Sequence, residues 1–137
     1  MKKILLSIFS LVLVLSLSHL AAGQTGSSSL NDQLIQAADK GDTTAVQQLL
    51  AKGANIESRN SDGYTSLLIA ATSGNADVVK VLLAKGANIE VRTHDGNTAL
   101  IQAAKFNCID VAKLLLEKGA NIDATDKGGW TALKWAD

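Results

Sequence analysis

A six-residue segment that returns every 33 residues constrains this chain more than any other feature. It reads DGYTSL at residues 62–67, DGNTAL at 95–100 and GGWTAL at 128–133. A second segment keeps the same period, as GANIE at 53–57 and 86–90 and GANID at 119–123. A period of this length that holds a turn and two short helical patterns predicts a stack of helix–turn–helix units, because each unit buries its apolar face only against its neighbours.

The period divides the chain into units that together form one repeat domain at residues 30–137. Two complete repeats lie at 60–92 and 93–125, preceded by a degenerate N-terminal capping repeat at 30–59 and followed by a half repeat at 126–137. Each complete repeat is expected to contain a turn at its Asp-Gly pair and two helices. The expected first helices cover 66–73 and 99–106, and the expected second helices cover 77–84 and 110–117.

Small polar residues mark where the first helices begin. The side chains of Thr65 and Thr98 can accept a hydrogen bond from a backbone N–H, and Asp32 takes their place in the capping repeat. We therefore expect Asp32 to cap the first helix of that repeat. Its second helix is expected at about 44–51, where Gly53 ends it in a left-handed backbone conformation.

At these segments the chain resembles the ankyrin repeat family, whose pattern is D-x-x-G-x-T-P-L-H-x-A-A-x-x-G followed by a second helix that ends L-L-x-x-G-A. The resemblance covers residues 30–137 and implies an all-α solenoid of helix–turn–helix units with β-turn fingers. Two family positions differ in this chain. The family's proline is replaced by Ser66, Ala99 and Ala132, and its histidine by Leu68, Ile101 and Lys134. The family's histidine hydrogen bonds between repeats are therefore not expected here.

Residues 1–23 are predicted to be an export signal. A short basic start precedes an apolar run at 4–17, which is shorter than the roughly 20 residues that a membrane-spanning helix needs. Cleavage is expected after Ala22 or Gly23, and the alternative is an uncleaved anchor helix. The predicted location is the periplasm or the cell exterior, with no stable membrane insertion after cleavage. Residues 24–29 are expected to form a flexible leader.

Charge and cysteine content narrow the classes of function. The chain has 13 basic and 13 acidic residues, so no net field favours nucleic acid as a partner. Cys108 is the single cysteine and cannot form a disulfide within the chain. It is expected to be a small, partly buried thiol at the position that Asn75 holds one repeat earlier. The alternative is a disulfide between two chains.

Residue types that catalyse reactions or bind metals do not converge in the sequence. After the export signal His94 is the only histidine, and it stands beside Asp95 in a turn that is expected to project from the stack. No catalytic residue, metal site or cofactor is predicted, and the chain is not expected to be an enzyme.

The resemblance implies a concave surface, formed by the fingertips and the exposed side of the first helices, that binds other proteins. The residues expected on it are Arg59, Ser61, Asp62, Tyr64, Thr72, Ser73, Arg92, His94, Asp95, Asn97, Lys105, Phe106, Thr125, Lys127 and Trp130. Tyrosine, tryptophan and arginine often dominate binding energy at interfaces. The alternative for Phe106 and Trp130 is that they shield the C-terminal end. Trp135 is expected in the core or cap, because its counterparts Ile69 and Gln102 lie on the first helix away from the fingertip.

These features favour an exported, non-enzymatic ankyrin-repeat scaffold that binds another protein of unknown identity. One alternative is a self-associating structural protein that forms a homodimer through its C-terminal half repeat. Another is a small hydrolase or small-molecule binder, which needs a pocket with convergent polar groups. Some exported bacterial ankyrin proteins are associated with protection against oxidants through a catalase partner, and a periplasmic factor of that kind is a further alternative.

Overall fold

The computed structural model describes residues 28–137, and these residues form seven α-helices. The helices are α2 (Leu30–Lys40), α3 (Thr43–Ala51), α4 (Ser66–Ser73), α5 (Ala76–Ala84), α6 (Ala99–Lys105), α7 (Ile109–Glu117) and α8 (Ala132–Ala136). Within this range there is no strand, and an isolated bridge joins Thr125 to Thr131. The predicted all-α repeat architecture is confirmed. The predicted export signal at 1–23 and residues 24–27 of the leader lie outside the described residues.

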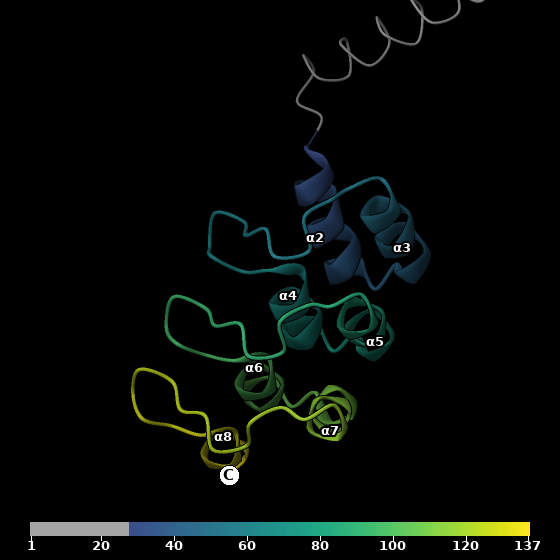
Figure 1. Cartoon of the computed structure of the whole chain (residues 1–137). Helices are drawn as coiled ribbons and strands as arrows, with labels where there is room; N and C mark the ends of the chain where they lie inside the picture. The colour runs from purple at the N-terminus through teal and green to yellow at the C-terminus, as the bar shows by residue number, and fades with distance from the viewer. Residues whose placement is uncertain (1–27) are drawn as a thin grey trace, which may run out of the picture.

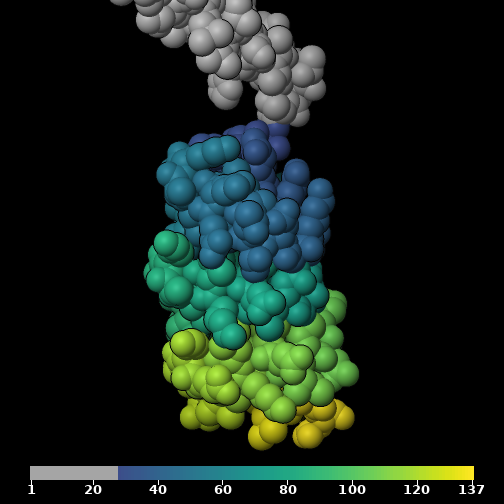
Figure 2. Space-filling view, turned by 90° about the vertical axis from the view of Figure 1, so that its right-hand side faces the viewer, coloured from purple at the N-terminus to yellow at the C-terminus, as the bar shows by residue number. Residues whose placement is uncertain are grey.

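The helices form two columns, with the fingers on one side of them (Figure 1). The first helices α2, α4, α6 and α8 stack on one another, and the second helices α3, α5 and α7 stack behind them. The loops between a second helix and the next first helix extend as fingers on the side away from the second helices. Figure 2 looks at the second-helix side and shows the units as successive layers.

The N-terminal ends of the first helices are capped as the period predicts. The hydroxyl oxygens of Thr65, Thr98 and Thr131 each accept a hydrogen bond of 3.3 Å from the backbone N–H three residues later. Each cap satisfies one of the N–H groups that has no partner within the helix. The first helices at Ser66 and Ala99 therefore begin where the sequence indicated.

The expectation for α2 was wrong by three residues. Ser29, not Asp32, is the N-cap: its hydroxyl accepts from the Asp32 N–H at 3.2 Å, and the Asp32 carboxylate accepts from the Ser29 N–H at 3.2 Å. This reciprocal pair is a capping box, so Asp32 stabilises the helix from its first turn rather than from the position before it. Ser29 is consequently part of the folded domain and not of a flexible leader.

Positive φ angles end the first helices. Gly41 and Gly74 have φ of 75° and 76° after α2 and α4, and Asn107 takes the corresponding place after α6 with φ of 56°. Asparagine is among the few residues other than glycine that adopt this left-handed conformation without large strain. The turn into the second helix is thus kept in all three units.

The core is a continuous column of small and branched apolar side chains. Ala70, Ala71 and Ala103 are fully buried on the first helices, and Val78, Val79 and Leu82 fill the space behind α4. Alanine leaves room for adjacent first helices to approach closely, while the branched residues supply the buried area that holds the two columns together.

Candidate functional site

The surface predicted to bind partners is called the finger-side surface here. It consists of the fingertips at 59–64, 92–97 and 125–130 together with the last turns of α2, α4 and α6. Most of its expected members are exposed or half-buried. Their hydrogen bonds divide them into residues that build the surface and residues whose side chains are presented by it.

The two arginines join one finger to the next. Arg59 Nη1 donates to the carbonyl oxygens of Gly63 at 2.6 Å and Arg92 at 2.7 Å. Arg92 Nη1 repeats the arrangement, donating to Gly96 at 2.8 Å and Thr125 at 2.6 Å. The same guanidinium nitrogen thus closes its own fingertip and ties it to the following finger. Both side chains are exposed, but their identified contacts are structural.

His94 and Lys127 cover the glycine of the preceding fingertip. A Cβ atom built on Gly63 would lie 2.5 Å from His94 Nε2, and one built on Gly96 would lie 3.2 Å from Lys127 Cγ. The Lys127 N–H also donates to the Asp95 carbonyl at 3.0 Å. A side chain at 63 would displace the His94 ring, and one at 96 would press on the Lys127 backbone N, which lies 3.0 Å from the built Cβ; both glycines also have a positive φ of 83° that other residues rarely adopt. His94 is placed here as a packing element and not beside a nucleophile.

Gln102 joins α6 to the fingertip of the preceding repeat, at 59–64. The sequence had predicted that this position lies away from the fingertips. Its side chain is 1% exposed, and Nε2 donates to Tyr64 Oη at 3.0 Å and to Thr72 Oγ1 at 3.1 Å. The Tyr64 ring therefore packs against the stack with its hydroxyl engaged. The signal for this contact was a polar residue at the position that Ile69 occupies one repeat earlier.

Asn97 does not belong to the exposed surface, and this expectation was wrong. Its side chain is 2% exposed, its N–H donates to Thr93 Oγ1 at 3.1 Å, and its Oδ1 has no partner within the described residues. The equivalent positions hold Tyr64 and Trp130. Those two rings are long enough to emerge partly from the finger, whereas the short asparagine side chain is covered by its surroundings.

The C-terminal end of the finger-side surface carries a tryptophan cluster, defined as Lys105, Asp126, Trp130, Lys134 and Trp135. The two indole ring centroids lie 4.8 Å apart at an angle of 44°. Lys105 Nζ lies 4.3 Å from the Trp135 ring centroid, and Lys134 Nζ lies 4.6 Å from that of Trp130. Both pairs are within the range of cation–π attraction. Trp135 is half-buried against the core, whereas Trp130 is 39% exposed.

Asp126 organises this cluster. Its Oδ1 accepts from the N–H groups of Trp130 at 2.9 Å and Gly128 at 2.8 Å, and its Oδ2 accepts from Trp135 Nε1 at 2.9 Å. The backbone N–H of Trp130 is the main cause that lowers the pKa of the Asp126 carboxyl below its ordinary value of 3.8. The Trp135 and Gly128 donors and the nearby Lys105 charge act in the same direction, against partial desolvation.

The remaining expected residues lie on the surface between these features. Ser73 Oγ donates to Asp39 Oδ1 at 2.6 Å, and Thr72 Oγ1 donates to the Leu68 carbonyl at 2.8 Å. Phe106 is 55% exposed, which makes it the most exposed aromatic side chain of the described residues. The other exposed members are Ser61, Asp62, Asp95 and Thr125.

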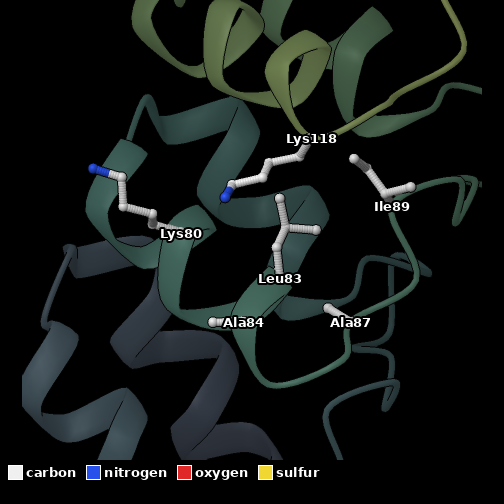
Figure 3. Close-up of a pocket in the computed structure, with 6 residues that line it drawn as sticks. All are labelled: Lys80, Leu83, Ala84, Ala87, Ile89 and Lys118. Atoms are coloured by element: carbon white, nitrogen blue, oxygen red, sulfur yellow. The ribbon is translucent and has the colours of Figure 1, made fainter.

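Hollows also lie outside the finger-side surface. One of about 330 Å³ lies on the second-helix side and is lined by Lys80, Leu83, Ala84, Ala87, Ile89 and Lys118. Figure 3 shows the Lys118 side chain extended over Leu83 while the Lys80 side chain points away. Another hollow lies beside Cys108, the N-cap residue of α7, which is partly buried with its Sγ 3.6 Å from the Thr72 carbonyl oxygen. Asp110 also lines this second hollow, but the Cys108 thiol is hydrogen-bonded to the carbonyl oxygens of Thr72 and Phe106 and, among the described residues, not to that carboxylate.

Two further observations concern residues 28–137 only. No group of three or more histidine, cysteine, aspartate or glutamate side chains in this range is placed to hold a metal ion. No helix there is both long and apolar enough to cross a membrane.

The comparisons with known proteins agree with this architecture. A family model described as ankyrin repeats (3 copies) matches residues 34–126, which is more than half of the chain. No curated protein matches the chain. Ankyrin repeats generally act as scaffolds that bind other proteins, and proteins built from them are typically not enzymes. The matched residues contain the turn, first helix and second helix of both complete repeats, and the chain belongs to the ankyrin repeat family.

Proposed function

We propose that this chain is a non-enzymatic scaffold that binds another protein through its finger-side surface. The observation that carries the proposal is the tying of successive fingers by Arg59 and Arg92, each with two hydrogen bonds to backbone carbonyls. Fingers joined in this way are ordered before a partner arrives. Docking on a preformed surface loses less conformational entropy than docking on mobile loops.

The exposed aromatic side chains of this surface provide anchors. Phe106 and Trp130 are 55% and 39% exposed, and both lie near its C-terminal end. Aromatic residues supply large contact area with few rotatable bonds, and truncating a true anchor costs about 2 kcal/mol or more of binding energy. Tyr64 is half-buried, and its hydroxyl, which accepts from Gln102, keeps an O–H that can donate to a partner.

Photo-cross-linking tests which side of the molecule meets the partner. A photoreactive amino acid is placed at Ser73 or Asp62 on the finger-side surface, and at Lys80 or Glu117 on the second-helix side, in cells that naturally make the protein. All four positions are exposed; the substitution at Ser73 removes its hydrogen bond to Asp39, so Asp62 provides the finger-side position at which no side-chain hydrogen bond is lost. Cross-linked adducts from Ser73 and Asp62 alone support the proposal. Adducts that form only, or equally well, from Lys80 and Glu117 contradict it.

We also propose that the scaffold acts outside the cytoplasm, on the basis of the predicted export signal at 1–23. The test is the mass of the N-terminal peptide of the protein purified from its own cells, together with the fraction in which it is found. A chain that begins at Gly23 or Gln24 in the periplasm or the medium supports the proposal. A chain that retains Met1 and stays in the cytoplasm contradicts it.

A further inference from the structure

The finger-side surface changes its charge from one end of the stack to the other. At one set of equivalent positions the last turns of successive first helices carry Asp39, Thr72 and Lys105, which stand 33 residues apart. Asp39 and Lys105 are exposed. The charge at this position therefore changes from negative to neutral to positive from the first repeat to the third.

Contacts across the repeats show that these positions belong to one row. Asp39 accepts a hydrogen bond from Ser73 on the next first helix at 2.6 Å. Thr72 accepts one from Gln102 on the helix after that at 3.1 Å. Lys105 lies over the Trp135 ring of α8. Each member of the row thus contacts the following repeat on the same side of the stack.

The fingertips follow the same trend. One equivalent position holds Ser61, His94 and Lys127, and the adjacent position holds Asp62, Asp95 and Gly128. A positive side chain is gained and a negative one is lost towards the C-terminal end. Charged groups of the opposite sign exist at both ends: Lys40 follows Asp39, and Asp126 lies in the tryptophan cluster, where its oxygens accept from three N–H groups.

The positive end combines charge with aromatic surface. Lys105 and Lys134 hold their ammonium groups over indole rings, and the neighbouring aromatic side chains Trp130 and Phe106, the latter next to Lys105 in the sequence, are 39% and 55% exposed. Such a surface is complementary to an acidic side chain that has an apolar neighbour. It disfavours a basic segment, because juxtaposed like charges repel one another.

We propose that the tryptophan cluster binds an acidic, apolar segment of the partner polypeptide, and that the charge change along the stack sets the direction in which this segment docks. The proposal rests on the proposed function and adds the chemistry of the partner to it. The acidic part of the segment lies against Lys105 and Lys134. Any basic part extends over the fingers towards Asp62 and Asp39.

The chain contains its own reporter for this binding. Its only two tryptophans are Trp130 and Trp135, so tryptophan fluorescence reports on the cluster alone. The probe is a short tryptophan-free peptide of glutamate–leucine pairs separated by glycine. Two sister peptides carry glutamine or lysine in place of glutamate. Each peptide is titrated into the intact protein at low ionic strength and again in physiological salt.

The acidic peptide should bind roughly tenfold or more tightly than the glutamine peptide, and the lysine peptide should bind most weakly. Added salt should reduce the preference, because exposed charges are screened over a Debye length of about 8 Å at physiological ionic strength. The double variant K105Q/K134Q should bind the acidic peptide no better than the glutamine peptide. The matched control K80Q/K118Q removes two positive charges from the second-helix side and should retain the preference.

Thermal unfolding of both double variants checks that each remains folded. Equal binding of the three peptides, no fluorescence response to the acidic peptide, or an unchanged preference in K105Q/K134Q would overturn the inference. These results are separate from the photo-cross-linking outcome. Finger-side cross-links without an acidic preference would retain the scaffold and reject the proposed partner chemistry, whereas cross-links on the second-helix side would reject both.

Discussion

The helices α6 and α8 begin with the same motif but occupy different environments. Each follows a threonine N-cap, and each has a leucine at its second position. Leu100 of α6 is 3% exposed, whereas Leu133 of α8 is 66% exposed. α6 packs against α4, α7 and α8, whereas the main helix contact of α8 is with α6. The burial of a repeat residue is therefore decided by its place in the stack as well as by its identity.

The two helices also connect differently to the finger-side surface. In α6 the buried Gln102 amide hydrogen-bonds to Tyr64 and so joins the helix to the finger of the preceding repeat. In α8 the equivalent Trp135 donates to Asp126 in its own finger and supports Lys105 on its ring face. A neutral buried contact in the middle of the stack is replaced by a charged aromatic cluster at its end. The difference creates the feature on which the proposed partner chemistry depends.

The largest expected effect is a difference in stability between alanine variants of Leu100 and Leu133. Leu100→Ala should lower the free energy of unfolding by about 2–5 kcal/mol, because it removes buried methyl groups and leaves a cavity. Leu133→Ala should change it by no more than about 0.5 kcal/mol, because the side chain is largely exposed already. Urea unfolding followed by circular dichroism measures both values. Equal losses in the two variants would contradict the comparison.

Gln102→Leu is expected to have the next largest effect. The substitution keeps much of the volume but removes both hydrogen bonds donated by Nε2, and it should cost about 1–3 kcal/mol of unfolding free energy. Gln36→Leu at the equivalent exposed position of α2 serves as the matched control and should be nearly neutral. The tie between helix and finger would be refuted by a Gln102→Leu variant as stable as the parent chain.

Arg92→Gln should loosen the last two fingers more than it destabilises the whole domain. It removes two hydrogen bonds to the carbonyls of Gly96 and Thr125 and should cost about 1–2 kcal/mol, because a single hydrogen bond contributes about 0.5–1.5 kcal/mol net. Hydrogen exchange should quicken at 92–97 and 125–130 in this variant. Arg59→Gln should quicken it at 59–64 and 92–97 and leave 125–130 unchanged. Uniform quickening over the domain in both variants would show that the arginines do not act on individual fingers.

The smallest effect concerns pH. Because folding lowers the pKa of Asp126, its ionised form stabilises the fold fully above its ordinary pKa of 3.8, and this contribution is lost as the pH falls further through the folded-state pKa. The difference in melting temperature between the parent chain and Asp126→Asn should therefore shrink as the pH falls below 3.8. Asp62→Asn controls for the loss of one negative charge. A constant difference down to pH values below the lowered pKa would disagree with this account.

The fold could be predicted from the sequence because the repeat supplies several consistent local signals. Thr65 and Thr98 mark helix starts, and alanine pairs such as Ala70 and Ala71 mark where first helices meet. The start of α2 was placed wrongly because Asp32 has two capping modes, as the cap itself or as the third helical residue of a capping box. Ser29, three residues before Asp32, identifies the capping box. Aligning Asp32 with Thr65 and Thr98 drew attention away from Ser29.

The candidate surface could be predicted only by position. Equivalence between repeats correctly placed Phe106 and Trp130 at exposed sites, but it could not show that Arg59 and Arg92 use their donors on backbone carbonyls. It also placed Asn97 on the surface. Equivalent positions share a backbone location, but whether a side chain reaches solvent depends also on its length. The hydrogen bond between Gln102 and Tyr64 joins two different repeats. A sequence pattern that describes a single repeat cannot predict such a contact.

Hydrogen exchange of the chain alone and bound to its cross-linked partner tests the central claim most directly. The claim predicts protection at the fingertips 59–64 and 92–97, at the last turns of α4 and α6 and around Trp130. It predicts unchanged exchange on the outer face of α3, α5 and α7. Protection concentrated on the second helices, with the fingertips unaffected, would contradict the account and place the binding surface on the opposite side of the stack.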